Sequence, residues 1–205
     1  MKPEYWNKGK TYLSKNDKVL KNIIKLFSNE NLELNPNHYH ALLNSIISQQ
    51  ISVLAANSIK TKFFNLHNKI VPNNVLKLDE ISLKNCGLSR QKILYIKNIS
   101  TFFLENKKFI NNIHLYDEIS IKDKLISIKG VGNWTADMFL LFSYGSSDIF
   151  PEGDLGFIKA ISKFYKKKIP ISSSHLKKLK KRWSPYSSIA TWYLWRSLDP
   201  IPISY

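Results

Sequence analysis

The chain has 205 residues, 43% of them hydrophobic, which is enough for the packed core of one globular domain and excludes a disordered tail. It carries 31 Lys and Arg against 15 Asp and Glu, so its formal net charge of +16 favours a polyanion, nucleic acid above all, as its partner. A single cysteine excludes an internal disulfide, a thiolate zinc site and a four-cysteine iron–sulfur cluster.

The sequence also predicts where the protein resides. No apolar stretch approaches the length that spans a bilayer, and the first residues lack the apolar run of a secretory signal. His38 and His40 have no further ligands at metal spacing, so we predict no metal site. We therefore expect a cytoplasmic protein with no membrane partner, associated with the nucleoid through DNA binding.

Hydrophobic residues recur at helical spacing along almost the whole chain. The pattern is clear over 42–59, and similar patterns occupy about 14–28, 90–105, 117–128, 134–144, 155–165, 174–182 and 186–198. Breakers rich in Gly, Pro and Asn separate these segments, and convincing period-two alternation is absent. We predict an all-α protein of about nine or ten short helices.

Positive charge is concentrated in residues 159–182, where no acidic residue occurs. The ten basic residues of this segment are Lys159, Lys163, Lys166, Lys167, Lys168, Lys177, Lys178, Lys180, Lys181 and Arg182. Such a run fits a contact with the DNA backbone, and it fits equally a solvated helix face.

A tight turn, Gly130-Val131-Gly132, separates an apolar helix from the helix that starts near Trp134. We expect both glycines to allow positive φ and to let a phosphate approach the backbone closely. The free N–H groups at the start of the second helix, together with its dipole, then form an anion site. A turn of this kind also occurs as a plain connection between helices.

Asp154 lies between a Gly-rich loop and the next predicted helix. Aspartate is a good N-cap, and a cap position also holds a carboxylate rigidly enough for catalysis, so the two roles are compatible. Two other acidic residues lie nearby. Asp137 falls inside the second hairpin helix, where a surface or structural role is expected, and Glu152 shares the loop of Asp154.

Three segments, 130–158, 46–56 and 183–196, together resemble the helix-hairpin-helix (HhH-GPD) DNA glycosylases, specifically the DNA-3-methyladenine glycosylase II branch. The resemblance implies an all-α, two-lobed fold with an active-site cleft between the lobes. It also implies that residues 1–205 form a single glycosylase domain. In that domain the hairpin covers about 122–144, and the N- and C-terminal helices pack together as one lobe.

The resemblance assigns a reaction as well. It makes Asp154 the catalytic carboxylate, which stabilises positive charge on the deoxyribose while the bond to the damaged base breaks. Relatives that also nick the backbone carry a lysine nucleophile at the position of Trp134, and Lys129 lies on the wrong side of the turn. The expected enzyme is therefore a monofunctional hydrolase of alkylated purines such as 3-methyladenine, without AP lyase activity.

The family's base pocket corresponds to Trp134 and Trp195, whose electron-rich faces suit a cationic alkylated purine. Met138 and Leu155 also match pocket positions, but they are aromatic in a bacterial relative, which leaves the range of accepted bases open. For the other two tryptophans of the C-terminal segment we expect a place in the core: these are Trp183 and Trp192.

Contacts to double-stranded DNA with a damaged base are expected from two segments. One is the backbone of Gly130, Val131 and Gly132, and the other is the loop with Gln49 and Gln50. Gln50 either fills the gap left by the extruded base or is simply a polar helix end. Many relatives bind a monovalent cation through carbonyls just before the hairpin, and no other cofactor is expected. A monomer suffices for base excision from a duplex, so we expect a monomer.

Two alternatives remain at this point. The chain could be a glycosylase for another base lesion, or a non-catalytic helix-hairpin-helix protein that binds DNA through phosphates alone. Asp154 separates the second alternative from catalysis, because an anion next to DNA weakens binding unless it serves the chemistry.

Overall fold

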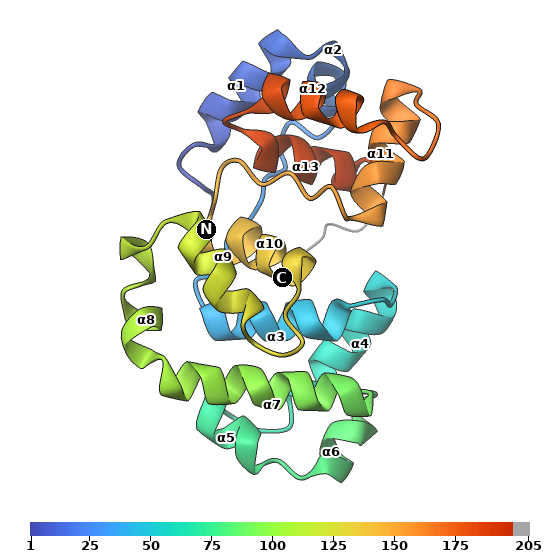
Figure 1. Cartoon of the computed structure of the whole chain (residues 1–205). Helices are drawn as coiled ribbons and strands as arrows, with labels where there is room; N and C mark the ends of the chain where they lie inside the picture. The colour runs from blue at the N-terminus through green and yellow to red at the C-terminus, as the bar shows by residue number, and fades with distance from the viewer. Residues whose placement is uncertain (199–205) are drawn as a thin grey trace. The chain divides into compact units, whose positions relative to one another are not determined.

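The structure, a computed structural model, describes residues 1–198, which are helical with no β-strand among them (Figure 1). They divide into two compact units, one made of residues 1–34 and 145–198 and the other of residues 35–144. The prediction of an all-α fold is confirmed, but the predicted helix count is too low, because thirteen α-helices lie within residues 1–198. In this part of the chain no helix is both long enough and apolar enough to traverse a bilayer.

The first unit contains the helices from both ends of the described chain. They are α1 (Trp6–Asn16), α2 (Lys18–Leu26), α11 (Leu155–Tyr165), α12 (Ser173–Trp183) and α13 (Ser187–Arg196). The prediction of one helix over 14–28 is wrong, because Asp17 adopts extended backbone (φ −142°, ψ 111°) between α1 and α2. Its carboxylate accepts the N–H groups of Val19 and Leu20 at 2.9 and 3.2 Å and so starts a new helix.

Aromatic side chains form much of the core of this unit. Trp6 of α1 is 1% exposed; its ring stacks 5.6 Å from that of Tyr193 and meets the ring of Trp192 edge-on at 5.3 Å. Trp183 and Trp192 are both buried, as predicted. Burial of a large apolar side chain stabilises a fold by about 1.5–3 kcal/mol, so these contacts hold α1 firmly to α13.

Asp17 also ties α2 to the C-terminal helices. Its Oδ2 accepts hydrogen bonds from the Tyr165 hydroxyl at 2.9 Å and the Trp183 indole at 3.0 Å, and Arg182 lies 3.3 Å away. A buried carboxylate is tolerated only when donors surround it in this way. The network therefore anchors the C-terminal end of α11 and the end of α12.

The second unit contains the remaining helices. They are α3 (His38–Ser48), α4 (Val53–Phe64), α5 (Pro72–Lys77), α6 (Glu80–Asn85), α7 (Arg90–Glu105), α8 (Lys107–Asn111), α9 (Glu118–Ile126) and α10 (Asn133–Phe139), with a 3₁₀ turn at Ile113–Leu115 and a π-helical turn at Leu140–Tyr144. The long helix α7 lies between α3 and α5 (Figure 1).

Two boundaries in this unit differ from the predictions. The apolar pattern over 42–59 belongs to two helices, because the chain breaks after α3 and Ser52 caps α4 by accepting the N–H of Ala55 at 3.3 Å. No helical pattern was predicted between residues 59 and 90, yet Pro72, part of a predicted breaker, stands in the first turn of α5. Proline fits there because the first helical N–H has no partner within a helix.

Candidate functional site

Asp154 stands at the start of α11 and caps it. Its Oδ1 accepts the N–H of Phe157 at 2.6 Å, and the same oxygen accepts the indole Nε1–H of Trp195 at 2.8 Å. The first bond is local and the second comes from α13, so the carboxylate is fixed from two directions. The N-terminal end of the helix dipole also faces this anion.

Gly156 makes this close approach possible. A Cβ at Gly156 would lie 3.2 Å from Oδ1 of Asp154 and 3.6 Å from the ring of Trp195. That spacing is tighter than an ordinary van der Waals contact with the oxygen, so any larger residue would press on the carboxylate. The glycine therefore serves the contact between Asp154 and Trp195.

The loop that leads to Asp154 is held by the first turns of α13. The hydroxyl of Ser188 donates to the Ser146 carbonyl at 2.6 Å and accepts the N–H of Ile149 at 2.9 Å. Thr191 donates to the Ile149 carbonyl at 3.1 Å. The predictions did not include these small hydroxyl residues. In the sequence, Ser187, Ser188 and Thr191 stand out as polar residues in an otherwise apolar segment. In the structure all three side chains are buried.

The hairpin of the second unit connects α9 to α10. Gly130 has φ +106°, and a Cβ there would overlap the ring of Tyr95. Gly132 has φ −98° and ψ −178°, so of the two glycines expected to allow positive φ only Gly130 adopts it. Apart from Gly132 and its immediate chain neighbours, no atom of the described residues lies within 4 Å of a Cβ built at Gly132, so the space beside this residue is open.

The backbone amides of the hairpin are not equally available. The N–H of Val131 donates to the Ile128 carbonyl at 2.9 Å, so this expected DNA-binding amide is committed to the turn. Gly132 is the N-cap of α10, and the amides of the first turn that follows have no acceptor within a helix. An anion approaching the open side of Gly132 would meet these groups.

The α3–α4 loop is joined to the hairpin by Gln49. The side-chain amide of Gln49 donates to Oγ1 of Thr135 at 2.9 Å and to the Gly130 carbonyl at 3.4 Å. Gln49 was expected to bind DNA, but its amide nitrogen is used inside this unit. Gln50, the next residue, is exposed and adopts a left-handed conformation (φ 56°), which is uncommon for a residue with a Cβ.

One face of α7 braces both segments. Lys92 donates from Nζ to the carbonyls of Ile47 and Gln49 at 2.8 and 2.9 Å. Tyr95 packs against Gly130, and Asn98 donates to the Lys129 carbonyl at 3.0 Å. These braces were not predicted from the sequence, although Lys92, Tyr95 and Asn98 recur every three residues and so share one face of the helix.

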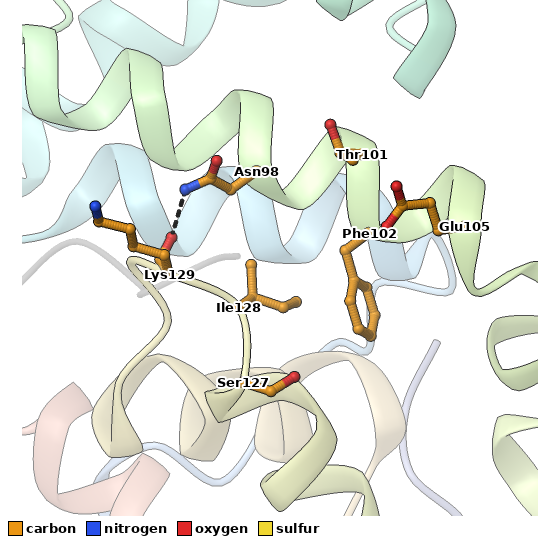
Figure 2. Close-up of a pocket in the computed structure, with 7 residues that line it drawn as sticks. All are labelled: Asn98, Thr101, Phe102, Glu105, Ser127, Ile128 and Lys129. Atoms are coloured by element: carbon orange, nitrogen blue, oxygen red, sulfur yellow. Dashed lines mark hydrogen bonds between the residues drawn. The ribbon is translucent and has the colours of Figure 1, made fainter.

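Helix α7 and the start of the hairpin turn also border an open pocket of about 230 Å³ (Figure 2). It is lined by Asn98, Thr101, Phe102, Glu105, Ser127, Ile128 and Lys129. Figure 2 shows the Asn98 amide bonded to the Lys129 backbone at one side of this pocket. It holds none of the predicted site residues, and its polar walls come from α7 and the end of α9.

The four residues predicted for the base pocket have different surroundings. Trp195 is 6% exposed and touches Asp154, while Leu155 is 75% exposed at the start of α11. In the second unit, Trp134 is half-buried in the first turn of α10, and Met138, one turn later, is 1% exposed. The part of all four residues in base recognition, Trp195 included, stays a prediction.

The two rival carboxylates differ from Asp154. Asp137 forms an ion pair with Lys122 at 2.5 Å, which joins α10 to α9. Glu152 lies exposed in the loop before α11. Within residues 1–198, no three His, Cys, Asp or Glu side chains gather in an arrangement that would hold a metal ion.

Comparison with known proteins agrees with this architecture. DNA-3-methyladenine glycosylase 1 of Schizosaccharomyces pombe is 28% identical over 202 residues, covering 93% of this chain and 86% of the relative. The Bacillus subtilis protein YfjP is 28% identical over 169 residues, covering 78% of this chain, and this chain spans only 59% of its length. The solved structure of S. pombe 3-methyladenine DNA glycosylase (Mag1) in complex with abasic DNA superposes with a TM-score of 0.80 and 27% identity, covering 93% of this chain and 96% of that one.

The family model of the HhH-GPD superfamily of base excision DNA repair proteins matches residues 43–185, which include the hairpin, its α7 braces and Asp154. This match extends over well more than half of the chain, and it covers two of the three segments on which the sequence resemblance depended, 46–56 and 130–158, and the first residues of the third. The chain therefore belongs to the HhH-GPD superfamily of base excision DNA repair proteins.

Proposed function

We propose that this protein is a monofunctional DNA glycosylase that hydrolyses the N-glycosidic bond of alkylated purines such as 3-methyladenine in duplex DNA. The observation that carries the proposal is the fixed carboxylate of Asp154, which two donors hold through one oxygen. The names of the relatives, which describe DNA-3-methyladenine glycosylases, support the choice of substrate. A substrate in chromosomal DNA would place the enzyme in the cytoplasm, at the nucleoid.

In this mechanism Asp154 stabilises the cationic sugar. As the bond between C1′ and the base breaks, its electron pair leaves with the base, and positive charge develops on the deoxyribose. A base that is already cationic leaves as a neutral molecule, so little general-acid assistance is needed. Water then adds its oxygen to C1′ and loses one proton, while the carboxylate stabilises the charge and orients the water.

The damaged base must leave the helical stack before this reaction, because its glycosidic bond is inaccessible within the duplex. The exposed, left-handed Gln50 is the residue proposed to fill the resulting gap and to hydrogen-bond the orphaned base. The tryptophans proposed to select a cationic purine are those of the sequence prediction, Trp134 and Trp195.

The absence of AP lyase activity is part of the proposal. Strand cleavage by relatives requires an amine that forms a Schiff base with the sugar, and an indole such as that of Trp134 cannot do so. Of the neighbouring lysines, Lys122 is paired with Asp137. The expected product is therefore an abasic site in an unbroken strand.

DNA backbone binding is assigned to the hairpin. The open side of Gly132 and the first-turn amides of α10 fit a phosphate, whose charge the helix dipole favours. We also propose a monovalent cation at the carbonyls that precede the turn. The Ile128 carbonyl accepts one hydrogen bond, from Val131, and keeps a second lone pair; a main-chain oxygen suits Na⁺ or K⁺ better than a transition metal.

The test is base release from duplex DNA treated with a methylating agent, with the released bases identified by chromatography. Wild type should release methylated purines and leave an unnicked abasic strand. Asp154→Asn should release none while binding damaged DNA as tightly or more tightly, and the control Glu152→Gln should behave as wild type.

Each other outcome points to a different function. Equal loss of binding and release in Asp154→Asn would make Asp154 a structural cap only. No release by a folded wild type that still binds DNA would contradict the proposal and would favour a glycosylase for another lesion or a non-catalytic binder. A nicked product would show that the protein is also a lyase.

A further inference from the structure

The basic segment over 159–182 forms an exposed surface of the first unit, here named the α11–α12 basic face. It consists of Lys159, Lys163, Lys166, Lys167, Lys168, Lys177, Lys178, Lys180, Lys181 and Arg182, all of which are exposed. The segment contains no acidic residue. Its residues are not part of the hairpin proposed to bind the DNA backbone.

On α11 the basic residues follow one face that begins beside Asp154. Phe157, Ala160 and Ile161 are buried, so Lys159 and Lys163, four residues apart, share the opposite, exposed face. A separation of four residues corresponds to about 6 Å along a helix axis. Two base-pair steps advance the phosphates of one DNA strand by a similar distance of about 7 Å.

On α12 the cations converge on the end of α11. His175, Lys178 and Arg182 recur at intervals of three and four residues, and the ring of His175 lies 6.5 Å from that of Tyr165. Burial, followed by the positive charges of Lys167, Arg182 and Lys178, lowers the pKa of His175. That electrostatic effect indicates that cations of α12 and of the loop that follows α11 share one region of positive potential.

Acidic compensation within this face is small. Asp17 accepts one hydrogen bond from Arg182, but this buried carboxylate also bonds Tyr165 and Trp183. Solvated helices commonly place Glu four residues before Lys, whereas here Lys178 and Arg182 repel each other at that spacing. The arrangement opposes helix stability by itself, and an external polyanion would relieve the repulsion.

We propose that the α11–α12 basic face binds the phosphate backbone of the duplex that flanks the damaged base. The inference rests on the proposed function, because Asp154, which caps the same helix, then marks the position of the damaged nucleotide. Lys159 and Lys163 follow α11 away from that position, Lys167 lies just beyond the end of this helix, and the cations of α12 extend the surface. The face carries no sequence preference, because phosphate contacts contain no base information.

The experiment compares two triple variants of the full chain. The test variant is Lys163→Gln/Lys167→Gln/Lys178→Gln. The control is Lys8→Gln/Lys18→Gln/Lys21→Gln, which removes three exposed lysines from α1 and α2 of the same unit. Each lowers the formal net charge from +16 to +13. Affinity is measured on 12- and 30-base-pair duplexes that carry a non-cleavable abasic analogue, as a function of salt concentration.

For the test variant we expect the slope of log K against log salt on the long duplex to fall by about 2–3, since each phosphate contact contributes about 0.9. The control should fall by less than about 1, and the test variant should lose less on the short duplex than on the long one. Thermal unfolding of the test variant should occur at or above the wild-type temperature, which excludes a folding defect.

Equal losses in the two variants, or equal losses on both duplex lengths, would overturn the proposal. So would a loss of affinity for single-stranded RNA with none for duplex DNA. Single-turnover base release at saturating protein keeps the two hypotheses apart: its absence in wild type contradicts the proposed function, while the salt slopes still decide whether this face binds duplex DNA.

Discussion

The indole Nε1–H of Trp195 donates a hydrogen bond of 2.8 Å to Oδ1 of Asp154, across 41 residues of sequence. The same oxygen accepts the N–H of Phe157 at 2.6 Å. Asp154 is therefore both a helix cap and a carboxylate positioned by tertiary structure. Each role supports the other, because the cap holds the side chain where the indole can reach it.

Trp195→Phe should slow base release by about tenfold, because loss of one hydrogen bond of about 1–1.5 kcal/mol frees the Asp154 carboxylate while the ring packing remains. Single-turnover kinetics on methylated duplex DNA measures the effect. Trp192→Phe, on the same helix and also buried, is the matched control. If both variants slow release equally, the bond between Trp195 and Asp154 has no special role.

Lys92→Met should destabilise the protein by about 1–3 kcal/mol, because the carbonyls of Ile47 and Gln49 lose a charged donor. Hydrogen exchange at Gln49 and Gln50 should become faster, since this donor holds their loop. Urea denaturation and amide exchange test the two effects. Lys92→Arg keeps a cationic donor, so it should retain part of the wild-type stability and part of the protection from exchange. Unchanged exchange at Gln49 and Gln50 in Lys92→Met would show that Lys92 does not hold this loop.

Two glycine substitutions in the hairpin should have opposite consequences. Gly130→Ala should lower stability by about 2–4 kcal/mol, because φ is +106° and a Cβ overlaps the ring of Tyr95. Gly132→Ala should leave stability nearly unchanged, because its φ is ordinary and the space is open, yet it should weaken DNA binding at least fivefold by obstructing a phosphate. Thermal unfolding and DNA affinity measure these effects. Wild-type DNA affinity in Gly132→Ala would contradict the proposed phosphate contact at Gly132.

His38 should make the protein less stable in mild acid. The Ser143 hydroxyl donates to the Asn35 carbonyl at 2.7 Å, so it accepts the Nδ1–H of a neutral His38 at 2.8 Å. Burial lowers the pKa of His38 below 6.5. The unfolded chain therefore takes up a proton first, and the stability present above about pH 6.5 is lost as the pH falls towards the folded-state pKa.

The measurement is the free energy of unfolding in urea between pH 8 and pH 5. His38→Gln should show a smaller decline than wild type across this range, whereas replacement of the exposed His114 by glutamine should not alter it. His175, whose pKa is also lowered, contributes in the same direction and accounts for part of the remaining decline. Parallel curves for wild type and His38→Gln would contradict the assignment.

Local chemistry explains which features the sequence predicted. The apolar period indicated helices, and Asp154, between a glycine-rich loop and an apolar helix, indicated a cap that the structure contains. The same logic erred at Asp17 and at Ser52, where a polar cap interrupts a continuous apolar pattern. Periodicity records which side of a helix is buried, and two consecutive helices can present matching patterns to one core.

By itself, the sequence determined the helical class, the hairpin turn at Gly130, the cap at Asp154 and the family. Only the tertiary structure decided which side chains hold these features: Trp195 for Asp154, Gln49 for the hairpin, and Lys92 for the loop before Gln50. The physical reason is distance along the chain. A cap or a turn depends on neighbours within a few residues, whereas these bonds join residues 41 to 86 positions apart. Helical spacing predicts which residues share a face of a helix, but it does not predict which segment packs against that face.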